Sequence, residues 1–154
     1  MPREGAKGTG MIIAALIAAA GRGTRAGGGR PKQWREIAGA SVAHWTLRAF
    51  SAHPCVIVIH PDDIDHARAA TRDIDVRIVT GGATRAASVR AGLEALSASP
   101  PDLVLIHDVA RCCVTAHVID GVVEALKHHP AAAPALPVTD ALWTGDAGLV
   151  TGTR

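Results

Sequence analysis

Apolar runs alternate with amphipathic segments along most of the chain. The run Met11–Ala18 predicts a first, fully buried strand, and three shorter runs predict strands at Cys55–Ile59, Val76–Val79 and Leu103–Ile106. Strands that alternate with helical patterns are typical of a mostly parallel sheet covered by helices on both faces. The sequence therefore predicts an α/β, Rossmann-like fold.

The segments between these runs have helical spacing. Ser41 is placed to cap one helix, and Asp62 or Asp63 is placed to cap a second that reaches about Thr71. Pro100-Pro101 ends a third helix, and a fourth is expected from about Ala116 to Lys127. The inward positions of the first, third and fourth helices are expected to be Val42, Trp45, Ala49; Ala86, Val89, Leu93, Leu96; and Val118, Val122, Val123, Leu126.

The loop after the first strand carries the most specific chemistry. It reads Ala19-Ala20-Gly21-Arg22-Gly23-Thr24-Arg25 and is followed by Pro31-Lys32-Gln33. Glycines let the backbone present N–H groups to an anion, and Arg25 and Lys32 add positive charge to the same loop. The loop is thus a candidate phosphate cradle.

Three interpretations of this loop compete: a glycine-rich basic turn without a ligand, a dinucleotide-binding loop, and a nucleotidyltransferase loop that holds a triphosphate. The dinucleotide fingerprint should open a helix, but Gly27-Gly28-Gly29 and Pro31 block helix growth. Residues 41–61 also lack the acidic ribose ligand, and no Gly-Lys-Ser/Thr follows as in a P-loop. The first and third interpretations remain.

Two other predicted strands end in polar loops, Thr80–Arg85 and His107–Arg111. Each loop alone could be a turn, a helix cap or a surface charge. Ligands of parallel sheets bind at the carboxyl ends of the strands, so the three loops together indicate one site. Its parts would be a phosphate loop, backbone groups with Ser88 for a base, and the Asp108 carboxylate for Mg²⁺.

The composition of the chain bears on its domain number and on whether it binds nucleic acid or spans a membrane. The 154 residues support one domain, and with 48% hydrophobic but 3% aromatic residues the core must consist of small aliphatic side chains. A net charge of +2 is too small to indicate a nucleic-acid partner. The run from Met11 to Ala20 is too short to span a membrane.

The cysteines and histidines do not indicate a structural metal. Cys112 and Cys113 are adjacent, which does not match zinc-ligand spacing. Three cysteines suit a reducing, cytoplasmic setting better than a disulfide framework. Residues 1–10 are expected to be a flexible extension, and residues 11–139 the α/β domain.

Together the motifs resemble the 2-C-methyl-D-erythritol 4-phosphate cytidylyltransferase family, from about Ile12 to Arg154. The motifs that carry the resemblance are Ala19-Ala20-Gly21-x-Gly23-x-Arg25, Pro31-Lys32-Gln33, Gly81-Gly82-x-x-Arg85-x-x-Ser88-Val89, Gly92-Leu93 and His107-Asp108-x-Ala110-Arg111. The resemblance implies a nucleotidyltransferase of glycosyltransferase-A-like fold. Such an enzyme joins CTP to a sugar-alcohol phosphate, releases pyrophosphate and serves isoprenoid precursor synthesis by the non-mevalonate pathway.

The resemblance also implies roles for single residues. Arg25 and Lys32 would be catalytic, stabilising charge at the α-phosphate, and Asp108 would approach the substrate and Mg²⁺. Arg111 and Arg154 would bind the acceptor phosphate substrate. The nucleotide-binding residues would be Ala19, Ala20, Gly21, Gly23, Gly82, Ala83 and Ser88.

The chain departs from the family pattern at several positions. Val109 is expected to add bulk beside the nucleotide, Cys112 replaces a proline, and Ala141 lacks a hydroxyl expected to bind phosphate. Residues 140–154 resemble the start of a β-arm that joins two subunits into a homodimer, and we expect a C-terminally truncated or degenerate copy. Two alternatives to the full activity follow: a weakly active or inactive CTP-binding remnant, and another sugar-phosphate cytidylyltransferase such as one for ribitol phosphate.

Overall fold

The computed structural model describes residues 10–22 and 30–153. The chain divides into two compact units, residues 1–115 and 116–154. The first unit contains the sheet, and the second contains one helix and a hairpin. The domain boundaries expected at residues 10 and 139 stay predictions.

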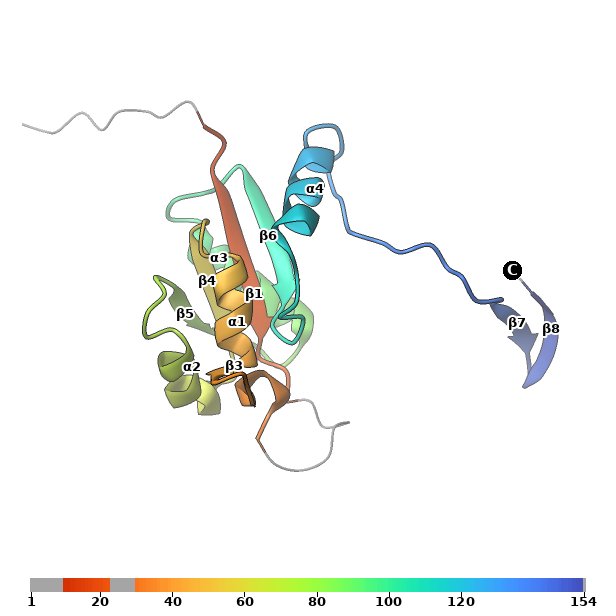
Figure 1. Ribbon diagram of the computed structural model, residues 1–154, viewed down its shortest axis with the longest axis horizontal. Coiled ribbons are helices and arrows are strands. Elements are labelled where there is room, and N and C mark those ends of the chain that lie inside the picture. Colours follow the sequence, from red (N-terminus) through yellow and green to blue (C-terminus); the bar gives the residue numbers. More distant parts are fainter. Residues whose placement is uncertain (1–9, 23–29, 154) are drawn as a thin grey trace, which may run out of the picture. The chain divides into compact units, whose positions relative to one another are not determined.

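A four-stranded parallel sheet forms the centre of the first unit (Figure 1). Its strands are β1 (Ile13–Ala19), β4 (Cys55–Ile59), β5 (Arg77–Thr80) and β6 (Leu103–Asp108), in the spatial order β5-β4-β1-β6. The strand β1 pairs with β4 on one side and with β6 on the other. The predicted α/β fold with a parallel sheet is confirmed.

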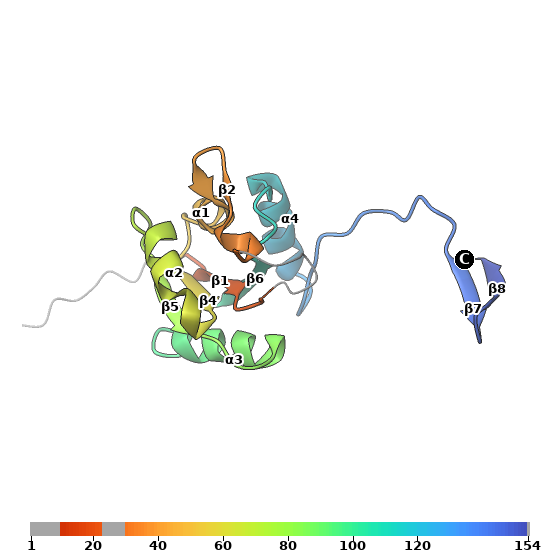
Figure 2. The same ribbon diagram turned by 90° about the horizontal axis from the view of Figure 1, so that it is seen from below.

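Helices cover both faces of this sheet. Seen along the strands, α1 (Val42–Ala49) lies on one face and α3 (Arg85–Leu96) on the other (Figure 2). The oxygen of Ser41 accepts a hydrogen bond from the His44 N–H at 3.1 Å, so Ser41 caps α1 as expected. The shorter elements of this unit are η2 (Lys32–Trp34), β2 (Glu36–Ile37), β3 (Ala40–Ser41), η3 (Pro61–Asp63) and α2 (Ile64–Ala70).

The core is densest around β1 and β4, where all five residues of β4 are buried. Gly92 lets α3 approach these two strands closely. A Cβ at this position would lie 2.6 Å from Leu16 Cδ1 and 2.8 Å from Val58 Cγ2, inside contact distance. Burial also raises the pKa of the Cys55 thiol in β4 to about 12, so Cys55 is a neutral core residue.

Some expected inward positions are wrong. Met11 and Ile12 are half exposed and precede β1, which begins at Ile13. Trp45 is exposed because its indole N–H donates to the Ile37 carbonyl at 2.7 Å, which lays the ring along the β2–β3 hairpin. Leu93 is exposed as well, because the buried stripe of α3 runs through Ser88 and Gly92, one position away.

The second unit consists of α4 (Ala116–Leu126) and an antiparallel hairpin of β7 (Trp143–Asp146) and β8 (Leu149–Thr153). Ala147 and Gly148 have φ of 47° and 83°, the left-handed conformation of a two-residue hairpin turn. The hairpin falls where the start of a β-arm was expected. Among residues 10–22 and 30–153, no helix is long and apolar enough to cross a membrane.

Candidate active site

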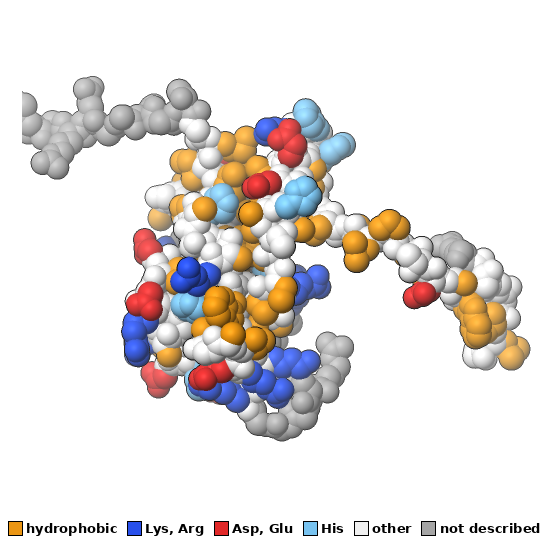
Figure 3. Space-filling model, in the orientation of Figure 1, with side chains coloured by type: hydrophobic (Ala, Val, Ile, Leu, Met, Phe, Trp, Pro, Cys, Tyr) orange, Lys and Arg blue, Asp and Glu red, His pale blue; other side chains and the backbone are white. Residues whose placement is uncertain are grey.

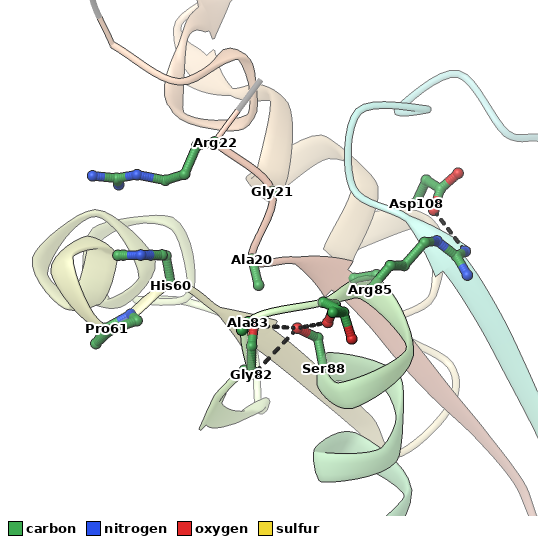
Figure 4. A pocket seen from close by; sticks show the side chains of 13 residues that line it. Ala20, Gly21, Arg22, His60, Pro61, Gly82, Ala83, Arg85, Ser88 and Asp108 are labelled. Atoms are coloured by element: carbon green, nitrogen blue, oxygen red, sulfur yellow. Dashed lines mark hydrogen bonds and ion pairs between the residues drawn. The ribbon is translucent and has the colours of Figure 1, made fainter. Parts of the chain in front are cut away.

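A cavity of about 580 Å³ lies at the carboxyl ends of the strands of the parallel sheet. The strand exits of β1, β4, β5 and β6 all contribute to its wall (Figure 4). The space-filling view shows Lys and Arg side chains gathered near this end of the sheet (Figure 3). The lining residues are Ala18, Ala20, Gly21, Arg22, His60, Pro61, Gly81, Gly82, Ala83, Thr84, Arg85, Ser88 and Asp108.

A buried glutamine shapes the start of the phosphate loop. The Gln33 amide is 4% exposed, and its Nε2 donates to the carbonyls of Ala19 at 3.0 Å and Gly21 at 2.9 Å. Both amide hydrogens are thereby used, and the carbonyls on either side of Ala20 are held in place. We call this arrangement the Gln33 clamp.

Lys32 precedes the clamp in η2 and is exposed. Gln33, the next residue, therefore orders the loop, and the Lys32 side chain remains available to an anion. Gly23 and Arg25 lie outside the described residues, as does Arg154.

The loop between β5 and α3 is closed by Ser88, which is 3% exposed. The Ser88 oxygen accepts from the Gly82 N–H at 3.2 Å, and its one hydrogen can go to the Thr84 carbonyl at 2.9 Å or the Gly82 carbonyl at 3.2 Å. A Cβ at Gly81 would lie 2.6 Å from the Ser88 oxygen, which explains the glycine there. Gly82, Ala83 and Ser88, the expected base-binding residues, thus share one corner of the cavity.

Asp108 supplies the carboxylate of the opposite corner. Its Oδ1 lies 3.0 Å from Arg85 Nη2, and its Oδ2 lies 3.2 Å from Arg111 Nε. These arginines are 65% and 76% exposed, so the ion pairs are solvated and can exchange partners at little cost. Arg111 does not line the cavity itself, but its ion pair with Asp108 connects it to the cavity wall.

The donor set at this corner is compatible with Mg²⁺. In the part of the chain that the structure describes, Asp108 is the one carboxylate lining the cavity, and no three side chains form a metal cluster. Mg²⁺ commonly takes one or two carboxylates, and phosphate oxygens and water complete its shell. A single aspartate beside a phosphate loop meets that requirement.

The sequence interpretation missed the exit of β4. His60 and Pro61 line the cavity because β4 lies between β5 and β1 in the sheet. A polar residue after a buried strand was a visible signal, but its importance depended on the strand order. Asp63 occupies the N-cap position of α2, one of the two positions expected, but its side chain makes no capping hydrogen bond; the His60 side chain instead caps η3 by accepting from the Asp62 N–H.

Both aspartates instead hold Arg22. The Arg22 guanidinium lies 3.1 Å from Asp62 Oδ2 and 3.2 Å from Asp63 Oδ1, and the Asp63 side chain is 4% exposed. Asp63 would be a buried, unpaired charge without this partner. The pairs join the loop after β1 to the loop after β4.

Two departures from the family pattern have structural outcomes. Val109 is 5% exposed and does not line the cavity, so its side chain adds bulk to the protein interior and not to the cavity wall. Its carbonyl accepts from the Thr46 hydroxyl at 2.6 Å. Cys112 and Cys113 are free thiols with sulfur atoms 4.0 Å apart, and burial, then the Cys113 thiol, raises the pKa of Cys112.

Comparison with known proteins identifies one family. The family model for IspD, 2-C-methyl-D-erythritol 4-phosphate cytidylyltransferase, matches residues 13–154. The chain is 56% identical over 147 residues to a bifunctional IspD/IspF enzyme of Ruegeria pomeroyi, covering 94% of this chain and 39% of the relative. It is 53% identical over 147 residues to a 2-C-methyl-D-erythritol 4-phosphate cytidylyltransferase of Roseobacter denitrificans, covering 93% and 66%.

Solved structures agree with these sequence matches. A crystal structure of 4-diphosphocytidyl-2C-methyl-D-erythritol synthase from Anaerococcus prevotii superposes with a TM-score of 0.80 at 28% identity, covering 94% of this chain and 64% of that one. The 2-C-methyl-D-erythritol 4-phosphate cytidylyltransferase of Thermus thermophilus gives a TM-score of 0.69 at 31% identity, covering 94% and 63%. The chain therefore spans about two thirds of its single-function relatives and 39% of the bifunctional one.

Proposed function

The chain belongs to the 2-C-methyl-D-erythritol 4-phosphate cytidylyltransferase family, and from this we propose that it transfers CMP from CTP to 2-C-methyl-D-erythritol 4-phosphate. Pyrophosphate would be the second product. One observation carries the proposal: a clamped phosphate loop, a closed base corner and a carboxylate face the same cavity. We infer a role in isoprenoid precursor synthesis from the substrate.

The nucleotide would occupy the wall formed by the exits of β1 and β5. The loop after β1 would hold the triphosphate through backbone N–H groups, and the Gln33 clamp orients its described part from Ala19 to Gly21. Gly82, Ala83 and Ser88 would contact cytosine. Because these groups are held before ligand arrives, little conformational entropy is lost on binding.

Transfer would depend on position and charge. The acceptor phosphate attacks the α-phosphate in line, a new P–O bond forms, and pyrophosphate leaves with the electrons of the broken bond. Arg25 and Lys32 would stabilise the added negative charge in the transition state. Arg111, with Arg154, would hold the acceptor.

Asp108 would hold Mg²⁺ together with phosphate oxygens. The ion, when bound, neutralises phosphate charge as a Lewis acid. Asp108 would give up one arginine partner to do so, and the exposed ion pairs to Arg85 and Arg111 make that exchange inexpensive.

We also propose a homodimer and a cytoplasmic location. The β7–β8 hairpin exposes Trp143 and Leu149, each at 73%, and a second copy of the chain would cover such apolar side chains (Figure 3). The three free cysteines agree with a reducing compartment. Sedimentation analysis of the full chain tests the dimer, and a monomer at micromolar concentration would contradict it.

The activity is tested by pyrophosphate release from Mg²⁺ and CTP with 2-C-methyl-D-erythritol 4-phosphate. We expect release to require the acceptor and to fall sharply with ribitol phosphate. CTP binding without turnover would contradict the proposed transfer, and faster turnover with ribitol phosphate would contradict the acceptor.

A further inference from the structure

The exit of β4 forms part of the cavity wall that no predicted role accounts for. His60 and Pro61 line the cavity there, next to Arg22 and on the side away from Asp108 and Arg85 (Figure 4). The His60 side chain is 33% exposed, so part of it is accessible to a ligand in the cavity that it lines. A polar ring in this position can contact a ligand that fills the cavity.

We propose that His60 binds the nucleotide, with its Nε2–H donating a hydrogen bond to an acceptor oxygen of the ligand. The inference rests on the proposed function, because it assumes that a nucleotide occupies this cavity. It assigns a specific donor atom to a residue outside the expected site.

The hydrogen-bond pattern fixes the tautomer of the ring. The Asp62 backbone N–H points at His60 Nδ1 with an N···N distance of 3.2 Å. A backbone amide can only donate, so Nδ1 must be the acceptor. A neutral imidazole with an accepting Nδ1 carries its hydrogen on Nε2.

The ring is also held in place before any ligand binds. Pro61 restricts the backbone after His60, and Asp62 is anchored through its carboxylate to Arg22 at 3.1 Å. The same Asp62 oxygen lies 3.4 Å from His60 Nδ1, so the charged groups facing the ring are Asp62 and Arg22, with Asp63 behind Arg22. Within residues 10–22 and 30–153, Nε2 has no hydrogen-bond partner.

Two parts of a nucleotide offer the required oxygen. A carbonyl oxygen of the base and a phosphate oxygen are both acceptors for a neutral N–H donor. Affinities for cytidine and for inorganic tripolyphosphate separate them, because only the first carries the base and only the second carries phosphate.

The decisive experiment compares two amide substitutions in the full chain. Gln places its N–H₂ near the Nε2 position, whereas Asn places its oxygen near the Nδ1 position. His60→Gln should therefore keep the donor to the ligand, and His60→Asn should keep the acceptor for the Asp62 N–H. Calorimetric titration with CTP and Mg²⁺ measures the affinity of each variant, with His60→Ala as the reference.

We expect His60→Ala and His60→Asn to raise the Kd for CTP about tenfold, the effect of one net hydrogen bond, and His60→Gln to stay within about threefold of wild type. A purely structural role predicts the opposite order, because only Asn preserves the turn. That order, or equal Kd values for all variants, would overturn the assignment of His60.

The control measurements keep the two proposals separate. Thermal unfolding of each variant shows whether a lost affinity reflects a lost fold. If wild type fails to bind CTP, the proposed function is contradicted and this inference falls with it. If wild type binds and the variants rank as expected, cytidine or tripolyphosphate identifies the oxygen that His60 contacts.

Discussion

The two walls of the cavity are built in different ways. The nucleotide wall is formed by the loops that follow β1 and β5, and buried polar groups such as Gln33 and Ser88 hold these loops in place. The Asp108 side leaves β6, an edge strand of the described sheet, where Leu105 is buried and Ile106 is 46% exposed. Its contacts are exposed ion pairs.

The two walls should therefore differ in how easily their contacts can be broken. A buried hydrogen bond is costly to break because the orphaned group is not rehydrated, so the nucleotide wall keeps its shape. A solvated ion pair contributes little and can be replaced by another charge, so Asp108 and its arginines can change partners. Substitution of the buried groups Gln33 and Ser88 should therefore lower stability, whereas substitution of the exposed Asp108 should chiefly lower activity.

The largest expected effect is at Lys32. Lys32→Ala should lower kcat about 100-fold or more, since removing one preorganised transition-state donor has that effect in other enzymes. The melting temperature should change little because Lys32 is exposed. Lys127→Ala, another exposed lysine, is the control for charge alone. Equal losses of activity and melting temperature would contradict the catalytic role.

Substitution of Gln33 should show how much the buried hydrogen bonds stabilise the nucleotide wall. Gln33→Met keeps the length of the side chain but leaves the Ala19 and Gly21 carbonyls without their donor. We expect the free energy of unfolding to fall by about 2–4 kcal/mol, with weaker CTP binding. Chemical denaturation measures the first and calorimetry the second. Gln33→Glu, which places a carboxylate against two carbonyl oxygens, should be at least as harmful. Unchanged stability and CTP affinity in both variants would show that the Gln33 clamp does not hold the loop.

Gly92 tests the packing that supports the same wall. Gly92→Ala should destabilise the fold by about 1–3 kcal/mol, because the new Cβ meets Leu16 and Val58. Gly121→Ala is the matched control, since a Cβ added there meets no atom of the described residues within 4 Å outside its own helix, and alanine favours a helix. Thermal unfolding should move in opposite directions for the two variants. Parallel shifts would show that α3 is not packed as closely as described.

Ser88 tests the base corner. Ser88→Ala removes the acceptor for the Gly82 N–H and should reduce the preference for CTP over UTP, by about tenfold in kcat/KM. Ser97→Ala, at the end of the same helix and exposed, serves as the control. An unchanged nucleotide preference would take Ser88 out of base recognition.

The smallest expected effect on stability belongs to Asp108. Asp108→Asn should change the free energy of unfolding by less than about 1 kcal/mol, since both of its ion pairs are solvated. Denaturant titration checks this value, and turnover of the same sample should be strongly reduced. A loss of stability as large as that of Gln33→Met would erase the contrast between the two walls.

Local patterns predicted most of the fold. The strand Cys55–Ile59 was predicted with the bounds that the structure has, because an apolar run at the centre of a parallel sheet has no exposed face. Errors arose at positions such as Met11 and Trp45, where the hydrophobic side chain stays partly in water. Periodicity alone cannot tell which end of an apolar run extends beyond its neighbouring strands.

The sequence by itself determined the alternation of strands and helices, the family, and the residue types at three of the four strand exits. Only the tertiary structure decided that β4 lies between β5 and β1, which brings His60 into the cavity. It also decided that Gln33 holds two carbonyls 12 and 14 residues away in the chain. The physical reason is that strand order and long-range hydrogen bonds depend on the packing of the whole sheet, whereas strands, turns and motifs are properties of short segments.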